Sequence, residues 1–271
     1  MSQRTILVTG STDGIGRATA LELARRGERV ILHGRNLAKV QQARDELARE
    51  VPGSALEVLA ADFSALAQVR AAADEVAARF PRLDVLINNA GISMRDRQLS
   101  VDGFELTFAV NHLAVFLLTN RLLGLLQRSA PARVVTVSSM LHINAKLDFE
   151  NLQGEKFYSG GRAYATSKLA NVLFTVELAE RVREKGITVN CLHPGAVDTK
   201  LLRSAFPSLQ GITVVQGAVT SVYLACSPEV AQVSGEYFDE CRPAPRSPLA
   251  SDPTARQHLW QLSEQLTAPW S

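Results

Sequence analysis

Tyr164 and Lys168 are residues whose types and spacing could do chemistry. They lie four residues apart in the segment YATSK, and residues at that spacing share one face of a helix. A tyrosine beside an ammonium group can exchange a proton with a substrate oxygen, because the positive charge stabilises the phenolate and lowers a pKa that is otherwise about 10. The same spacing is also common on solvated helix surfaces, so the pair alone leaves catalysis and a surface position both open.

A glycine-rich segment near the N-terminus could bind phosphate. The sequence LVTGSTDGIG places three glycines between a β-branched run and an apolar-periodic helix. A helix N-terminus at the carboxyl end of a first strand offers free N–H groups and a positive dipole to a diphosphate. The spacing GxxxGxG differs from the usual GxGxxG fingerprint, and a tight turn without a ligand is the alternative. The predicted cofactor contacts in this loop are Gly10, Ser11, Thr12, Asp13, Gly14, Ile15 and Gly16.

The end of the second predicted strand indicates which dinucleotide binds. It reads His33-Gly34-Arg35-Asn36, and this region should lie near the adenosine ribose. A carboxylate here would accept hydrogen bonds from a free 2′-hydroxyl, whereas a guanidinium complements a 2′-phosphate. We therefore expect NADP(H) to be preferred over NAD(H), with Arg35 and Asn36 as contacts. A solvated role for Arg35 is the alternative, and the negative charge of Asp13 opposes the preference.

Two further polar segments follow predicted strands. Asp62 and Phe63 come after the third strand, and Asn89, Ala90 and Gly91 come after the fourth. Either segment alone would be an ordinary turn. Because the carboxyl ends of parallel strands meet at one edge of a sheet, we predict that both segments contact the adenine and ribose.

The elements that position these residues alternate between strand and helix. We expect strands at residues 5–8, 29–32, 56–59, 85–87, 133–138, 187–192 and 235–238. We expect helices at 14–27, 37–50, about 65–80, about 101–128, 164–185 and 214–226, and a last helix with Asp252 as N-cap and Pro253 at its first position. This order predicts an α/β fold, a single doubly wound Rossmann domain over residues 1–271, with a mostly parallel sheet of about seven strands and helices on both faces.

Composition excludes several classes of protein. The 271 residues carry a net charge of +2 without a basic run, so nucleic acid is not an expected partner. Uninterrupted apolar stretches are too short to span a bilayer, and the N-terminus lacks a signal-peptide pattern. We therefore expect a cytoplasmic protein with no membrane span. The three cysteines lack the paired spacing of a metal or redox site, so no metal is expected.

Together these motifs resemble the short-chain dehydrogenase/reductase family. The similarity covers essentially the whole sequence, through TGSTDGIG, NNAG, Asn111, Ser139, YATSK and HPGAVDT. Each motif is weak alone, but their order and spacing are highly specific. The segments VNHLAVFLLT, YSGGRAYATSKLANVLF, VNCLHPGAV and LWQLSEQL resemble the retinol-dehydrogenase-like branch.

The resemblance implies a role for each catalytic residue. Tyr164 would be the general acid/base and a cofactor contact, and Lys168 would lower its pKa and bind the nicotinamide ribose. Ser139 would hold the substrate oxygen, although Ser138 is a competitor because neighbouring strand residues point to opposite faces. Asn111 would order a water on the proton relay; a buried asparagine with local hydrogen bonds is the alternative.

The resemblance also marks the nicotinamide and substrate sides of the site. Pro194, Gly195, Val197 and Thr199 would pack on the nicotinamide, with a substrate lid at about residues 199–213. An insertion at residues 140–163 would form a wall of the cleft, and a plain surface loop is its alternative. Apolar residues expected around the nicotinamide suit a lipophilic substrate: Met94, Met140, Leu141, Leu201, Leu202, Phe206 and Leu209. Arg95, Arg97 and Arg203 lie close to them in the sequence and oppose this preference.

These observations favour an NADP(H)-dependent oxidoreductase that interconverts a carbonyl and an alcohol on a small lipophilic substrate. The alternative from another class is a non-catalytic dinucleotide-binding redox sensor that acts through partners; the presence of Tyr164, Lys168 and Ser139 disfavours it. A homodimer or homotetramer is expected if the helices at 101–128 and 164–185 form an interface. The alternative is that both helices only cover the sheet.

Overall fold

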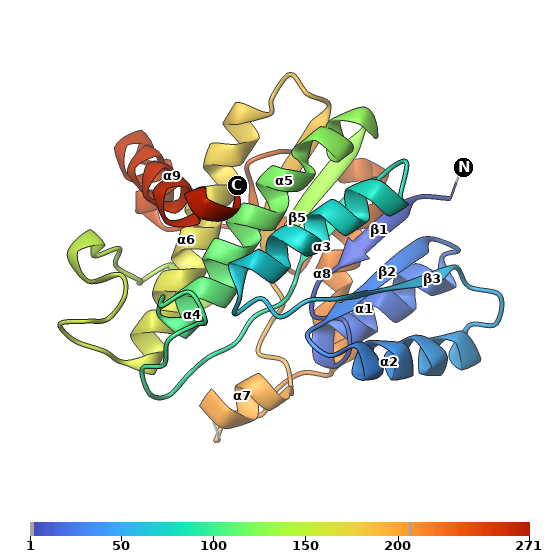
Figure 1. Cartoon of the computed structure of the whole chain (residues 1–271), viewed down its shortest axis with the longest axis horizontal. Helices are drawn as coiled ribbons and strands as arrows, with labels where there is room; N and C mark the ends of the chain where they lie inside the picture. The colour runs from blue at the N-terminus through green and yellow to red at the C-terminus, as the bar shows by residue number, and fades with distance from the viewer. Residues whose placement is uncertain (1–2, 206–207) are drawn as a thin grey trace.

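The computed structural model describes residues 3–205 and 208–271. These residues fold around one central eight-stranded sheet (Figure 1). The strand order is β3-β2-β1-β4-β5-β6-β7-β8, with β1 to β7 parallel and β8 antiparallel to β7. The strands are β1 (Thr5–Val8), β2 (Arg29–Gly34), β3 (Leu56–Ala60), β4 (Val85–Asn88), β5 (Ala132–Val137), β6 (Ile187–His193), β7 (Tyr237–Asp239) and β8 (Arg242–Pro243). The predicted doubly wound fold is confirmed. The expected count of about seven strands misses β8, because two residues are too few for any periodic pattern.

Helices cover both faces of this sheet (Figure 1). One apolar layer contains side chains of α3, α5, α6 and α9, and the other contains side chains of α1, α2 and α8. The helices are α1 (Gly14–Arg25), α2 (Leu37–Glu50), α3 (Leu66–Arg79), α4 (Leu106–Phe108), α5 (Ala114–Arg128), α6 (Gly160–Arg181), α7 (Lys200–Ala205), α8 (Val214–Cys226) and α9 (Pro253–Thr267). Because both faces are covered, β1 and β4 are buried along their whole length and show no polar alternation.

The last helix, α9, packs across α5 and α6. The Trp260 ring lies 4.9 Å from the Phe116 ring and 5.8 Å from the Phe174 ring, measured between centroids. The buried Arg256 guanidinium pairs with Glu177 of α6. The apolar residues of α5 and α6 that suggested a subunit interface therefore contact the protein's own last helix, and the oligomeric state stays a prediction.

One helical segment, Leu106–Arg128, is long and apolar enough by length and composition to cross a membrane. It begins five residues later than the sequence predicts, because residues 101–105 form a turn and Glu105 caps the helix with its carboxylate. Buried positions make up 78% of its most apolar stretch. Packing against α3 and α6 inside the protein accounts for its composition.

Candidate active site

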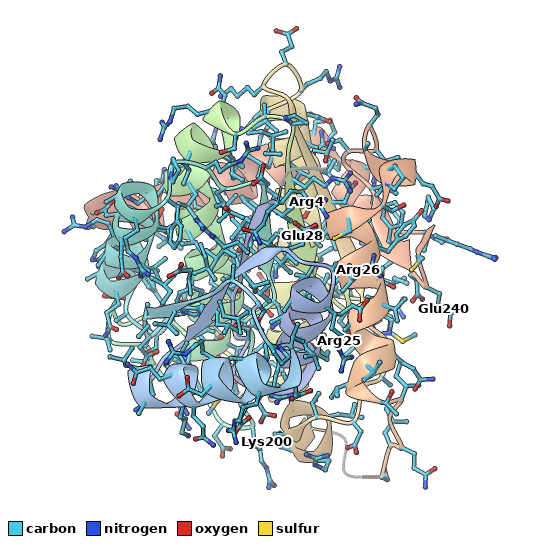
Figure 2. The ribbon with its side chains drawn as sticks, turned by 90° about the vertical axis from the view of Figure 1, so that its right-hand side faces the viewer. Arg4, Arg25, Arg26, Glu28, Lys200 and Glu240 are labelled. Carbon is cyan, nitrogen blue, oxygen red and sulfur yellow. The ribbon has the colours of Figure 1, made fainter. Side chains whose placement is uncertain are left out.

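A cleft of about 880 Å³ opens at the carboxyl edge of the parallel strands. Figure 2 shows that Lys200, at the start of α7, lies at the lower end of the molecule, whereas Arg4 and Glu28, which precede β1 and β2, lie toward the upper part. The cleft is therefore on the side where ligands bind in doubly wound sheets. Its lining includes thirteen of the predicted cofactor residues: Gly10, Thr12, Asp13, Gly14, Ile15, Gly16, Arg35, Asp62, Phe63, Asn89, Ala90, Gly91 and Thr199.

The glycine loop has the geometry of a phosphate cradle. Gly10 has φ of 64°, a conformation that glycine adopts without strain. A Cβ on Gly16 would lie 2.2 Å from the Gly10 carbonyl oxygen and 2.4 Å from Asn89 Nδ2. The first turn of α1 faces the cleft. Its backbone N–H groups have no intrahelical partners, as at the start of every helix. These residues fit the diphosphate of a nicotinamide dinucleotide.

His33 holds this loop in place, which the sequence did not reveal. Its Nδ1 accepts a hydrogen bond from the Gly10 N–H at 3.1 Å, and its Nε2 lies 3.1 Å from the Ala61 carbonyl oxygen. The ring stacks on Phe63 with centroids 4.2 Å apart. Burial lowers the pKa of His33 to about 4, so the ring stays neutral and keeps its acceptor. Its only signal in the sequence is its position two residues before Arg35.

Two predicted contacts around this loop have other partners. The Ser11 hydroxyl accepts a hydrogen bond from the His33 N–H at 2.8 Å, and Ser11 is fully buried. Asn36 caps α2 by accepting a hydrogen bond from the Lys39 N–H at 3.1 Å. Neither residue lines the cleft. Arg35 does line it, is exposed, and forms no ion pair with any residue in the described ranges 3–205 and 208–271.

Asn89 links the glycine loop to the end of β4. Its Nδ2 donates hydrogen bonds to the carbonyl oxygens of Thr9 at 2.8 Å and Gly10 at 3.1 Å. The amide was expected to contact the adenine or ribose, but its donors are engaged by the loop. Asn89 therefore shapes the cleft in addition to lining it.

Tyr164 and Lys168 are brought together near the end of β5. The Lys168 ammonium lies 5.5 Å from the Tyr164 ring centroid and donates a hydrogen bond to the Val137 carbonyl oxygen at 2.9 Å. The Ser139 hydroxyl lies close enough to the Tyr164 hydroxyl to lower the pKa of Tyr164. The Ser138 hydroxyl instead donates to the Lys168 carbonyl oxygen at 2.8 Å. The structure thus places Ser139, rather than Ser138, against the tyrosine.

Burial controls the protonation of this pair. It raises the pKa of Tyr164 to about 12, and the nearby Ser139 side chain, which lowers this pKa, only partly opposes the effect of burial. It lowers the pKa of Lys168 to about 8. The ammonium was expected to lower the tyrosine pKa, but in these surroundings desolvation outweighs that effect.

Asn111 lies in a π-helical turn, Ala109–Leu113, between α4 and α5. Such turns are rare and occur often at functional sites. The Asn111 side chain exchanges two hydrogen bonds with the Ile92 backbone, at 2.8 and 2.9 Å. A Cβ on Gly91 would lie 3.4 Å from both Asn111 Oδ1 and Lys168 Nζ. The side chains of Asn111 and Lys168 therefore both lie directly behind Gly91, which lines the cleft.

The segment after β6 has a supporting and a cleft-facing part. Val197 is buried and forms an isolated parallel β-bridge with Ile212. A Cβ on Gly195 would lie 2.7 Å from Ile212 Cδ1. Val197, Gly195 and Pro194 do not line the cleft, whereas Thr199 does. Lys200 Nζ lies 2.6 Å from Asp13 Oδ2, which joins α7 to the glycine loop. Movement of a lid over residues 199–213 stays a prediction.

The predicted substrate residues separate into four groups. Met94, Leu201 and Arg203 line the cleft, whereas Leu202 is buried and does not line it. Met140, Leu141 and Leu209 are exposed, as are Arg95 and Arg97. Phe206 lies outside the described residues.

The insertion at residues 140–163 packs against the rest of the protein. The Tyr158 hydroxyl donates to the Met94 carbonyl oxygen at 3.1 Å, and the Phe149 ring stacks on His258 of α9 with centroids 3.9 Å apart. None of residues 140–163 is among the residues that line the cleft, so the predicted wall stays a prediction beside the alternative of a surface loop.

Comparison with known proteins gives the family. The sequence profile described as short chain dehydrogenase matches residues 4–210. Retinol dehydrogenase 14 from Homo sapiens is 45% identical over 97% of this chain and 86% of that protein. A crystal structure of an uncharacterised protein from Mycobacterium paratuberculosis has a TM-score of 0.82 and 36% identity, and covers 98% of this chain and 94% of that chain.

A short chain dehydrogenase from Shigella flexneri 2a, solved in complex with NADP, has a TM-score of 0.75 and 28% identity, and covers 89% of this chain and 98% of that chain. The glycine loop, the Tyr164–Lys168 pair and these similarities agree with one another. The chain belongs to the short-chain dehydrogenase/reductase family, in its retinol-dehydrogenase-like branch, and is an oxidoreductase of the alcohol and carbonyl type.

Proposed function

We propose that this protein is an NADP(H)-dependent oxidoreductase that interconverts a carbonyl and an alcohol on a small lipophilic substrate, with Tyr164 as the general acid/base. One observation carries the proposal: Tyr164, Lys168 and Ser139 meet at the end of β5. The side chains of Asn111 and Lys168 also both lie directly behind Gly91, a residue of the dinucleotide-sized cleft.

A bound nicotinamide dinucleotide supplies the hydride in reduction and accepts it in oxidation. The protein's own residues handle the proton. The Ser139 hydroxyl holds the substrate oxygen beside Tyr164, whose phenol donates its proton as the carbonyl is reduced. The Lys168 ammonium stabilises the resulting phenolate. Because burial raises the pKa of Tyr164 to about 12, the phenol is protonated before reduction. In oxidation the phenol must first lose its proton, which requires additional positive charge in the cleft to lower the pKa of Tyr164.

Arg35 is the residue that supports a preference for NADP(H). It lines the cleft at the end of β2 and is free of carboxylate partners within the described part of the chain. A charge-assisted hydrogen bond to a 2′-phosphate contributes about 1.5–3 kcal/mol. Arg35→Ala should therefore weaken NADPH binding about tenfold or more at low salt and leave NADH binding unchanged, measured by fluorescence titration. Arg44→Ala, which removes a partly exposed arginine of α2 outside the cleft, is the control. Unchanged NADPH affinity in Arg35→Ala would refute this role.

The substrate is the other part of the proposal. Met94 and Leu201 line the cleft, and relatives named retinol dehydrogenases support a lipophilic alcohol or carbonyl. Across a panel of carbonyls with NADPH, apolar aldehydes and ketones, retinal among them, should give kcat/KM at least about tenfold above short hydroxy acids or sugars. The reverse order would show that Arg203 at the cleft, rather than the apolar residues, selects the substrate.

The same panel distinguishes an enzyme from a redox sensor. A sensor would bind NADPH through the glycine loop without oxidising it on any carbonyl. The buried ammonium of Lys168 beside Tyr164 has no evident use in such a protein, and this observation favours the enzyme.

A further inference from the structure

His142 is a buried residue that contacts Ser139 directly. It ends the 3₁₀ turn Met140–His142 and is fully buried. The Ser139 carbonyl oxygen lies 2.7 Å from His142 Nδ1 and 3.1 Å from the His142 backbone nitrogen. The backbone N–H and the ring therefore both bind one carbonyl oxygen.

The other ring nitrogen of His142 fixes the tautomer. Its Nε2 accepts a hydrogen bond from the Ser247 N–H at 3.3 Å. Since Nε2 is the acceptor, Nδ1 carries the proton and donates it to the Ser139 carbonyl oxygen. A rigid ring with a donor on one side and an acceptor on the other thus joins two segments that are 105 residues apart in the sequence.

The far end of this connection lies in the C-terminal part of the protein. Ser247 precedes the 3₁₀ turn Pro248–Ser251, and the Tyr237 ring of β7 packs on the His142 ring with centroids 4.4 Å apart. Both residues lie beyond the matched range 4–210 of the family profile. The C-terminal segment therefore holds a residue of the candidate active site through His142.

Ser139 is held from two sides by these contacts. Its backbone is extended, with φ of −162° and ψ of 151°. Its hydroxyl accepts a hydrogen bond from the Leu141 N–H at 3.3 Å and lies close enough to the Tyr164 hydroxyl to lower the pKa of Tyr164. Rotation of the Ser139 peptide plane would move the carbonyl from His142 and carry the hydroxyl away from Tyr164.

We propose that His142 is a positioning residue for the reaction: through its Nδ1–H bond to the Ser139 carbonyl oxygen, it fixes the Ser139 hydroxyl against Tyr164. This proposal rests on the proposed role of Ser139 in binding the substrate oxygen. A displacement of about 1 Å in a positioned group can lower the rate about 100-fold, so the effect is measurable although His142 does not touch the substrate.

Two substitutions separate the ring's two hydrogen bonds. The side-chain amide nitrogen of His142→Asn occupies the place of Nδ1 and can still donate to the Ser139 carbonyl oxygen. The longer amide of His142→Gln reaches toward the place of Nε2 and the Ser247 N–H, and leaves the Ser139 carbonyl oxygen with only its backbone donor. We expect kcat to fall about 10- to 100-fold in His142→Gln and only a few-fold in His142→Asn, with NADPH affinity unchanged in both.

A double-substitution cycle shows whether the effect passes through Ser139. In a Ser139→Ala background, His142→Gln should lower kcat no further. An equal loss of kcat and melting temperature in both single variants, or an additional loss in the Ser139→Ala background, would show a packing role and overturn the proposal. Unfolding of both variants would overturn it in the same way. Wild-type activity of Ser139→Ala itself would instead contradict the proposed function. An impaired Ser139→Ala with a fully active His142→Gln would contradict only the role of His142.

Discussion

Tyr164→Phe is expected to lower kcat by about 10²- to 10⁴-fold, the usual contribution of a positioned general acid/base. The substitution removes the phenolic proton but keeps the ring, which lies 5.5 Å from the Lys168 ammonium. The cleft residues that would hold the dinucleotide are unaffected. NADPH affinity, measured by fluorescence titration, should therefore remain within about twofold of the wild-type value, while steady-state NADPH oxidation is nearly lost.

Tyr158→Phe is the matched control for this variant. The Tyr158 hydroxyl also lies near the cleft wall, but it donates to the Met94 carbonyl oxygen at 3.1 Å and lies 3.2 Å from Glu105 Oε1. Its loss should lower stability by about 1 kcal/mol and leave proton transfer intact. If Tyr164→Phe kept wild-type kcat, or if Tyr158→Phe lost as much, Tyr164 would not be the acid/base.

Lys168→Met is expected to lose activity and gain stability. The ammonium is buried, and burial lowers its pKa from 10.5 to about 8. At about 1.4 kcal/mol per pKa unit, keeping this charge buried costs on the order of 3 kcal/mol at pH 7. Methionine fills similar volume without a charge, although it leaves the Val137 carbonyl oxygen without its donor. The variant should therefore unfold at higher denaturant concentration than the wild type at pH 7, with kcat lowered at least about 100-fold.

The pH dependence of this stability difference gives a sharper test. At pH 7, Lys168 is protonated in both the folded and the unfolded wild-type protein, so the folded state carries the full desolvation cost. As pH rises through about 8, the folded protein loses this proton, and above 10.5 the unfolded chain loses it too. The stability advantage of Lys168→Met over the wild type, as the difference in free energy of unfolding, should therefore shrink between pH 8 and 10.5.

Chemical denaturation of both proteins at pH 7 and pH 10 measures this convergence. Lys185→Met, which removes an exposed lysine beyond the end of α6, is the control and should show a small stability difference that does not change between the two pH values. A Lys168→Met variant that is less stable than the wild type at pH 7 would show that the hydrogen bond to Val137 outweighs the desolvation of the ammonium.

The sequence by itself determined the fold class, the family and most of the cleft. Alternating strand and helix patterns depend on local periodicity, so they were readable without tertiary contacts. The glycines at 10, 14 and 16 and the Tyr164–Lys168 spacing are also local, because each motif lies within one loop or one helix face. Their common position at the carboxyl edge then follows because parallel strands all end at the same edge of the sheet.

Only the tertiary structure decided which side chains face the site. The choice between Ser138 and Ser139 depended on the Lys168 carbonyl oxygen, which α6 places beside β5 and which binds the Ser138 hydroxyl. Ser11 proved to face His33 instead of the cleft. The rings of His33 and His142 form hydrogen bonds with backbone groups of distant segments, at Ala61 and Ser247 respectively. The pKa of Tyr164 likewise depends on burial by the whole fold. Sequence spacing records neighbours along the chain, whereas hydrogen-bond partners and desolvation depend on segments that meet only after folding.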